Sequence, residues 1–116
     1  MNILLDQALQ SHPVVEGDRV TFVWSGDRAP QLIGDMTDWQ WGSPIDLAED
    51  SPGIWTHTLT LPQDAYLEYA FWDGEQRVAD PLNLNTTPDG IGHENHFFHM
   101  PGARATKLTQ RRYGVP

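Results

Sequence analysis

Cysteine is absent from this 116-residue chain, and basic residues are few. Without cysteine, disulfide bonds and thiolate metal sites are excluded. Seven basic residues stand against 16 acidic ones, which makes the formal net charge −9 and the pI about 4.6. Nucleic acid and anionic membrane surfaces are bound through basic faces, so we expect neither as a partner.

Long apolar runs are missing too, and no segment approaches the roughly 20 residues that a membrane-spanning helix needs. The opening residues, MNILLDQALQSHP, lack the basic start of a signal peptide and carry an acidic residue at position 6. We therefore expect a soluble, cytoplasmic protein, and the length predicts one domain.

Motifs of catalysis are absent as well: there is no G-x-S-x-G elbow, no Walker glycine loop and no G-x-G-x-x-G fingerprint. Of the clustered histidines, His96 and His99 would face opposite sides of a strand, and His93 would precede that strand. Asp35 and Asp38 are compatible with a calcium loop or a carboxylate pair, but we favour a role in tightening a turn. We predict no enzyme activity, no metal and no cofactor.

The sequence does contain a series of short strand patterns separated by turn residues. Residues 3–9 fit a short amphipathic helix that ends near His12-Pro13. On the strand at 66–72, Leu67, Tyr69 and Phe71 are predicted to point inward. The fold class predicted is all-β, an antiparallel β-sandwich with one short N-terminal helix. Strands are predicted at 19–24, 31–34, 54–61, 66–72, 76–80 and 94–100, loops at 35–53 and 81–92, and a helical stretch at 105–112.

Charged residues are distributed unevenly along the chain. Residues 1–102 hold three basic and all 16 acidic residues, a formal charge of −13, whereas residues 103–116 hold four basic and no acidic residues. We divide the chain into a helical arm (1–18), a β-sandwich module (19–102) and a basic tail or linker (103–116). The tail is either solvated or docked on an acidic surface, its own or a neighbour's.

Five tryptophans are many for a chain of this length. Trp24 and Trp55 are in phase with apolar strand neighbours, so we predict that both lie in the core. Trp72 is out of phase and is predicted on an outer face or an interface. Trp39 and Trp41 belong to the loop that begins "GDMTDW", where an indole is able to stack on a sugar ring.

The order of these motifs resembles the glycogen-binding, isoamylase N-terminal type of carbohydrate-binding module. "FVWSGDRAPQLIGDMTDW" is similar to that family's strand, turn, second strand and Trp-containing segment. "GIWTHTLTLP", "LEYAFWDGEQRVADP" and "GIGHENHFFHMP" are similar to its later strands and loops, so the match covers roughly residues 19–101. The resemblance implies an immunoglobulin-like, early-set β-sandwich that binds α-glucans.

The same resemblance implies which residues would bind the sugar. The family's first binding Trp falls on Trp39, its second falls near Gln76 or Arg77, and its binding Lys falls on Ala70. Because that Lys and the second Trp are missing, the implied glucan affinity is weak, in about the millimolar range. The family's apolar loop residue and binding Asn fall on Ile91 and Asn95, and the complete candidate set is Trp39, Trp41, Gln76, Arg77, Ile91 and Asn95.

A second resemblance concerns "DPLNLN", "MP" and "RRYGVP", which are similar to the N-terminal module of enterochelin-esterase-like proteins. In that family such a sandwich precedes an α/β-hydrolase domain. The implied function is a non-catalytic accessory module that docks on a catalytic domain or another protein chain, with a homodimer left open. The alternative is a free-standing module that binds α-glucan weakly.

Overall fold

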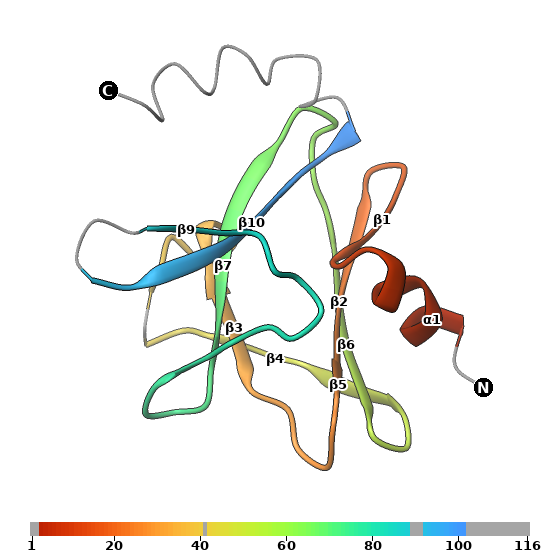
Figure 1. Cartoon of the computed structure of the whole chain (residues 1–116), viewed down its shortest axis with the longest axis horizontal. Helices are drawn as coiled ribbons and strands as arrows, with labels where there is room; N and C mark the ends of the chain where they lie inside the picture. Colours follow the sequence, from red (N-terminus) through yellow and green to blue (C-terminus); the bar gives the residue numbers. More distant parts are fainter. Residues whose placement is uncertain (1–2, 41, 89–91, 102–116) are drawn as a thin grey trace.

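The predicted strands form two antiparallel sheets that pack face to face (Figure 1). The computed structural model of the chain describes residues 3–40, 42–88 and 92–101. The elements are α1 (Ile3–Gln10), β1 (Val14–Glu16), β2 (Arg19–Ser25), β3 (Gln31–Gly34), the 3-10 helix η1 (Asp35–Thr37), β4 (Ile45–Asp46), β5 (Ala48–Ser51), β6 (Ile54–Thr60), β7 (Tyr66–Trp72), β8 (Arg77–Val78), β9 (Thr86–Pro88) and β10 (Glu94–His99).

The first sheet has the strand order β1-β2-β6-β5, and the second has the order β4-β3-β7-β10-β9. Strand β8 also pairs with β7, opposite Phe71 and Trp72. Since β3 occupies the other edge of β7 at those residues, β8 lies in line with β10. This alignment brings residues of β8 and β10 together on one face.

Because side chains alternate between the two faces along each strand, one face of each sheet is apolar, and these two faces pack together as a shared core. On β7, Leu67, Tyr69 and Phe71 are buried in the main cluster, which confirms their predicted inward orientation. The Tyr69 ring meets Phe22 of β2 edge to face, with centroids 4.9 Å apart. Burying one such side chain contributes about 2 kcal/mol to the free energy of unfolding.

Trp24 and Trp55, both predicted in the core, lie at its margin. They pair with each other across β2 and β6 near the end of the first sheet. Both pack against the main cluster but stay partly exposed. Trp24 meets Phe71 edge to face at 5.2 Å, and Trp55 donates its Nε1–H to the carbonyl of Gly26 at 2.9 Å.

Helix α1 confirms the helix predicted at 3–9 and covers the outer face of the first sheet (Figure 1). Val23 of β2, which alternation turns away from Phe22, is therefore buried under the helix instead of facing water. This second cluster consists of Ala8, Val14, Val23 and Ile54, with Leu4, Leu5 and Leu82 packed against it.

Residues 1–18, predicted as a helical arm, contain strand β1 as well as the helix. Val14 lies opposite Thr21 and Glu16 opposite Arg19, so β1 and β2 form a hairpin. A boundary between residues 18 and 19 cuts this hairpin, and the end of the arm belongs to the first sheet. Three residues are too few to show an alternating pattern in the sequence.

The two predicted loops also contain short elements. Residues 35–53 hold η1, β4 and β5, and residues 81–92 hold β9. The tail at 103–116, with the helical stretch predicted at 105–112, lies outside the described residues. None of the helices described is long and apolar enough to span a bilayer.

Candidate functional site on the outer face of the second sheet

The turn that follows β3 crosses the backbone of β7 at very short range. A Cβ atom on Gly34 would lie 2.5 Å from the carbonyl oxygen of Glu68 and 2.7 Å from Cα of Tyr69. Only glycine permits this approach. The turn then closes through η1, and Asp38 and Trp39 adopt left-handed backbone angles, with φ of 53° and 55°.

Asp35 holds this turn against β7 with both carboxylate oxygens. Its Oδ1 accepts the Nε1–H of Trp39 at 2.8 Å, and its Oδ2 accepts the backbone N–H of Glu68, also at 2.8 Å. This agrees with the turn-tightening role that the sequence favoured for Asp35. The indole of Trp39 is therefore anchored at its polar edge.

Arg77 of β8 covers the face of the same indole. Its guanidinium carbon lies 5.6 Å from the Trp39 ring centroid, which is cation–π range. The guanidinium also donates to the side-chain oxygen of Asn95 on β10. The contact is possible because β8 continues the line of β10 along the edge of β7.

Glu68 completes the group on the outer face of the second sheet, the face turned away from the core. Its Oε1 accepts from the Asn95 amide at 2.9 Å, and its Oε2 accepts from the Tyr66 hydroxyl at 3.0 Å. We call these residues the outer-face network: Asp35, Trp39, Tyr66, Glu68, Arg77 and Asn95.

Beside the network, residues of β7, β8, β9 and β10 line a small hollow of about 280 Å³. Ala70, at the position of the family's binding Lys, lies in its lining together with Arg77 and His93. The side chain of Ala70 is a single methyl group and is 3% exposed. No long side chain therefore reaches out of the sheet at this position.

The structure brings together three of the predicted site residues, Trp39, Arg77 and Asn95. Gln76 is exposed in the β7–β8 hairpin, where its backbone N–H donates to Asp73 Oδ1 at 2.9 Å. Trp41 and Ile91 lie outside the described residues. Asp35 and Glu68, which connect the network, were not among the predicted set, because an acidic residue in a turn or strand carries no specific signal in one sequence.

Farther along the outer face, three aromatic rings gather on β7 and β10. Tyr66 lies 5.8 Å from Phe97 and 4.9 Å from His99 between ring centroids. All three side chains are partly exposed. His99 therefore lies on the outer face, whereas His96 stacks on buried Tyr69 at 5.6 Å, and the prediction that the two histidines face opposite sides is confirmed.

His12 and Asp80 belong to a buried polar cluster, and as a pair they resemble part of a catalytic site. His12 Nδ1 lies 2.8 Å from Asp80 Oδ2, and both side chains are fully buried. However, His12 Nε2 accepts the backbone N–H of Val23 at 2.7 Å. Because this nitrogen is used by the backbone, it is unable to take a proton from a nucleophile, and the pair serves to anchor the arm.

Asp80 is the centre of that cluster. Burial raises the pKa of its carboxyl, but hydrogen bonds from His12, Tyr69 and the Leu82 amide outweigh burial, so the pKa is lowered. Burial, followed by the charge of Asp80, raises the pKa of Tyr69 well above its ordinary value. These shifts keep Asp80 charged and Tyr69 protonated, as a structural network requires.

Among the residues described, no group of three or more histidine, aspartate or glutamate side chains is placed to hold a metal ion. His96 Nε2 accepts the backbone N–H of Asp80 at 2.9 Å, so it is part of the buried cluster. The histidine spacing in the sequence thus reflects one buried and one outward strand position.

Comparison with known proteins supports the fold. No family model and no curated protein matches the chain. A solved structure of the enterobactin esterase from Shigella flexneri in the presence of enterobactin matches with a TM-score of 0.53 and 18% identity, over 72% of this chain and 30% of that one. The same esterase in the presence of 2,3-di-hydroxy-N-benzoyl-serine matches at a TM-score of 0.49 and 17% identity.

This chain spans less than a third of the esterase's length, and the matching part is the esterase's N-terminal, non-catalytic portion. At this level of identity the likeness establishes the fold: two antiparallel sheets packed as a sandwich, with one short N-terminal helix.

Proposed function

We propose that this protein is a non-catalytic accessory module that docks on the catalytic domain of an esterase-like hydrolase. The observation that carries the proposal is the aromatic group Tyr66, Phe97 and His99 on the outer face of the second sheet. The outer face of a sandwich is ordinarily polar, and partly exposed aromatic side chains are enriched at protein interfaces. The fold shared with part of the enterobactin esterase supports the same direction.

The experiment is a titration of the ¹⁵N-labelled chain with the catalytic portion of the Shigella flexneri esterase, lacking the esterase's own matching portion. We expect saturable amide shifts at Tyr66, Phe97 and His99, and at least about tenfold weaker binding for Phe97→Ala. The matched control is Ile3→Ala, which removes an exposed apolar side chain (72% exposed) from the helix over the other sheet. Shifts confined to the first sheet, or none at several hundred micromolar, would refute docking through this face.

Weak α-glucan binding is a second candidate, because Trp39, Arg77 and Asn95 do lie together beside a hollow. A sugar that stacks on Trp39 must first displace the guanidinium of Arg77, and the Asn95 amide is already bonded to Glu68. These costs support an affinity no better than about millimolar. Titration with β-cyclodextrin and maltoheptaose tests it: saturable shifts at Trp39 that vanish in Trp39→Ala would support glucan binding, and their absence at several millimolar would refute it.

A further inference from the structure

The aromatic group Tyr66, Phe97 and His99 has carboxylates next to it. Glu68 lies opposite Phe97 in the pairing of β7 with β10, and its Oε2 accepts from the Tyr66 hydroxyl at 3.0 Å. Asp64 is exposed and precedes Tyr66 by two residues, in the turn that leads into β7. The rings therefore have negatively charged neighbours both along β7 and in the turn before it.

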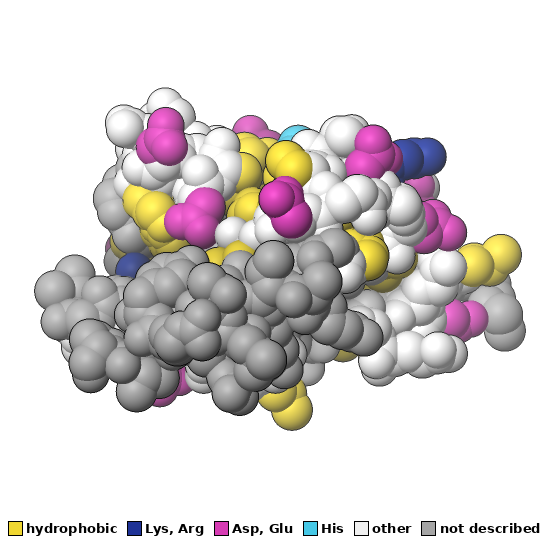
Figure 2. Space-filling model, turned by 90° about the horizontal axis from the view of Figure 1, so that it is seen from above, with side chains coloured by type: hydrophobic (Ala, Val, Ile, Leu, Met, Phe, Trp, Pro, Cys, Tyr) yellow, Lys and Arg dark blue, Asp and Glu magenta, His cyan; other side chains and the backbone are white. Residues whose placement is uncertain are grey.

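Positive charge is scarce near these rings. The guanidinium of Arg77 is engaged by Trp39 and Asn95, farther along the outer face. Figure 2 looks onto the end of the molecule where β6 turns into β7, and it shows several acidic and few basic side chains there. Residues 1–102 carry a formal charge of −13, and the basic residues of the tail still leave the chain at −9. A partner that approaches the rings thus meets a negative surface.

Charges around an apolar contact act mainly on the choice of partner and on the rate of association. Opposite charges on the partner steer it toward the contact, whereas like charges repel it. Arginine is suited to such a place, because its guanidinium pairs with carboxylates and also stacks on tyrosine and phenylalanine rings. The chemistry that fits this face is an apolar surface with basic side chains around it.

We propose that the surface of the catalytic domain that covers Tyr66, Phe97 and His99 is apolar at its centre and basic around it, with arginine or lysine side chains facing Glu68 and Asp64. This inference rests on the proposed function, because it describes the partner surface that docking requires. A second copy of this chain fits less well, since a symmetric contact would bring the same carboxylates face to face.

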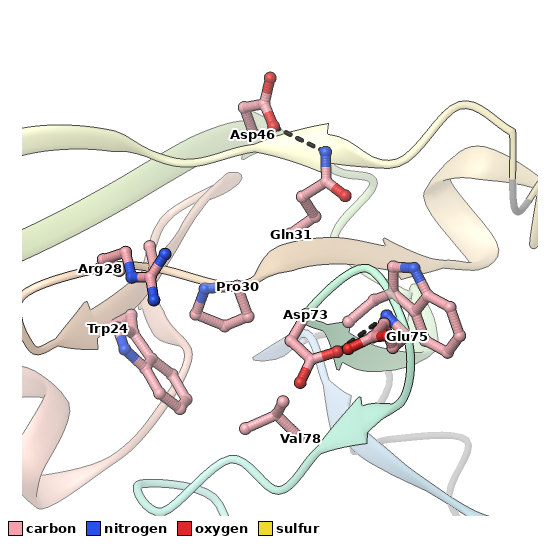
Figure 3. Close-up of a pocket in the computed structure, with 10 residues that line it drawn as sticks. Trp24, Arg28, Pro30, Gln31, Asp46, Asp73, Glu75 and Val78 are labelled. Carbon is pink, nitrogen blue, oxygen red and sulfur yellow. Dashed lines mark hydrogen bonds between the residues drawn. The ribbon is translucent and has the colours of Figure 1, made fainter.

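A hollow of about 640 Å³ at the opposite end of the sandwich supplies a control position. It lies where β2 and β7 end, and its lining includes Trp24, Asp46 and Asp73 (Figure 3). Asp46 is exposed and accepts from the Gln31 amide at 2.8 Å. Asp46→Asn and Asp64→Asn remove the same charge, one at each end of the molecule, and asparagine keeps an oxygen that accepts from Gln31.

The first test repeats the titration of the full-length ¹⁵N-labelled chain with the catalytic portion of the Shigella flexneri esterase, at 50 and 500 mM NaCl. We expect saturable amide shifts at Tyr66, Phe97 and His99, with a Kd at least about fivefold weaker at the higher salt concentration. The same shifts with an unchanged or tighter Kd at 500 mM would overturn this proposal and leave docking intact. No shifts at either salt concentration would refute docking itself, and this proposal with it.

The second test compares the two charge variants at 50 mM NaCl. We expect Asp64→Asn to weaken binding about threefold and Asp46→Asn less than about 1.5-fold. Equal effects would reduce the attraction to net charge and overturn the proposal.

Two further titrations address other occupants of the face. A synthetic peptide of residues 103–116 that shifts the same three residues as tightly as the catalytic portion does would assign the face to the chain's own tail. Shifts at these residues that depend on the concentration of the chain alone would assign it to a second copy. Either result would overturn the proposal.

Discussion

Two surfaces of this protein combine tryptophan with charged side chains, and they differ in what their polar groups bind. In the outer-face network, Asp35, Glu68 and Asn95 each bond two neighbours, and Arg77 covers the indole of Trp39. At the hollow lined by Trp24, Asp46 and Asp73, Asp46 accepts from the Gln31 amide, and Asp73 accepts from the backbone of Glu75 and Gln76 in its own hairpin. The polar groups of the first surface bond one another across three strands and a turn, whereas those of the second bond only residues beside them and otherwise face solvent.

This comparison revises the meaning of the motif "GDMTDW". Its indole is not a bare platform, because Asp35 binds the edge of the ring and Arg77 covers the face. The resemblance to sugar-binding modules concerns this turn. What the turn is able to bind depends on partners from β7 and β8, which the motif does not contain.

The largest effect is expected from Gly34→Ala. The new Cβ would lie within 3 Å of the backbone of Glu68 and Tyr69, so the turn that carries Asp35 and Trp39 must move. We expect a loss of about 3 kcal/mol in the free energy of unfolding, measured by urea denaturation. Gly42→Ala, where a Cβ meets nothing within 4 Å, is the control and should change stability by less than about 0.5 kcal/mol. Equal stability of the two variants would show that the close crossing does not exist.

Two exposed aspartates test the comparison directly. Asp35→Ala leaves the indole N–H of Trp39 and the backbone N–H of Glu68 without their acceptor. We expect this change to cost about 1.5 kcal/mol of unfolding free energy. Asp46→Ala, in the hollow beside Trp24, loses one exposed side-chain hydrogen bond and should cost less than about 0.5 kcal/mol. If urea denaturation gives equal losses, the two surfaces do not differ as described.

A smaller difference is expected between the hydrogen-exchange rates of the Trp39 and Trp24 indole N–H groups, and measuring it needs no mutation. The Nε1–H of Trp39 is bonded to Asp35, whereas that of Trp24 donates no hydrogen bond within the described residues. We expect the Trp24 indole proton to exchange with solvent about fivefold faster, since one hydrogen bond is worth about 1 kcal/mol. NMR hydrogen exchange on the indole signals measures this ratio. Faster exchange at Trp39 would mean that its bond to Asp35 does not form.

The dependence of folding stability on pH should come from histidines whose pKa is lowered by burial. Burial lowers the pKa of His96 below its ordinary value of 6.5. The unfolded chain therefore takes up a proton first, so stability is full above pH 6.5 and declines as the pH falls toward the lower folded value. Denaturation at pH 7.5 and 5.5 measures the decline, which should shrink in His96→Gln. Burial also lowers the pKa of His57, so His57→Gln serves to measure its share of the decline.

Several features of the fold were readable from the sequence because they depend on neighbouring residues. Strands β2, β7 and β10 are six or seven residues long, enough for alternation to show which side chains point inward. Leu67, Tyr69 and Phe71 were assigned in this way. Strands β1, β4 and β9, of two or three residues each, were not predicted, because so few residues show no alternation and the strands are defined by their pairing with β2, β3 and β10.

By itself the sequence determined the longer strands, the inward face of β7, the glycine turn after β3 and the strong negative charge. Only the tertiary structure decided which polar groups are satisfied and which remain available. Alignment of β8 with β10 places Arg77 against Asn95 and over Trp39, and the meeting of three strand ends gathers Trp24, Asp46 and Asp73 around one groove. The physical reason is range: alternation acts between residues two apart, whereas hydrogen-bond partners and groove walls come from residues far apart along the chain.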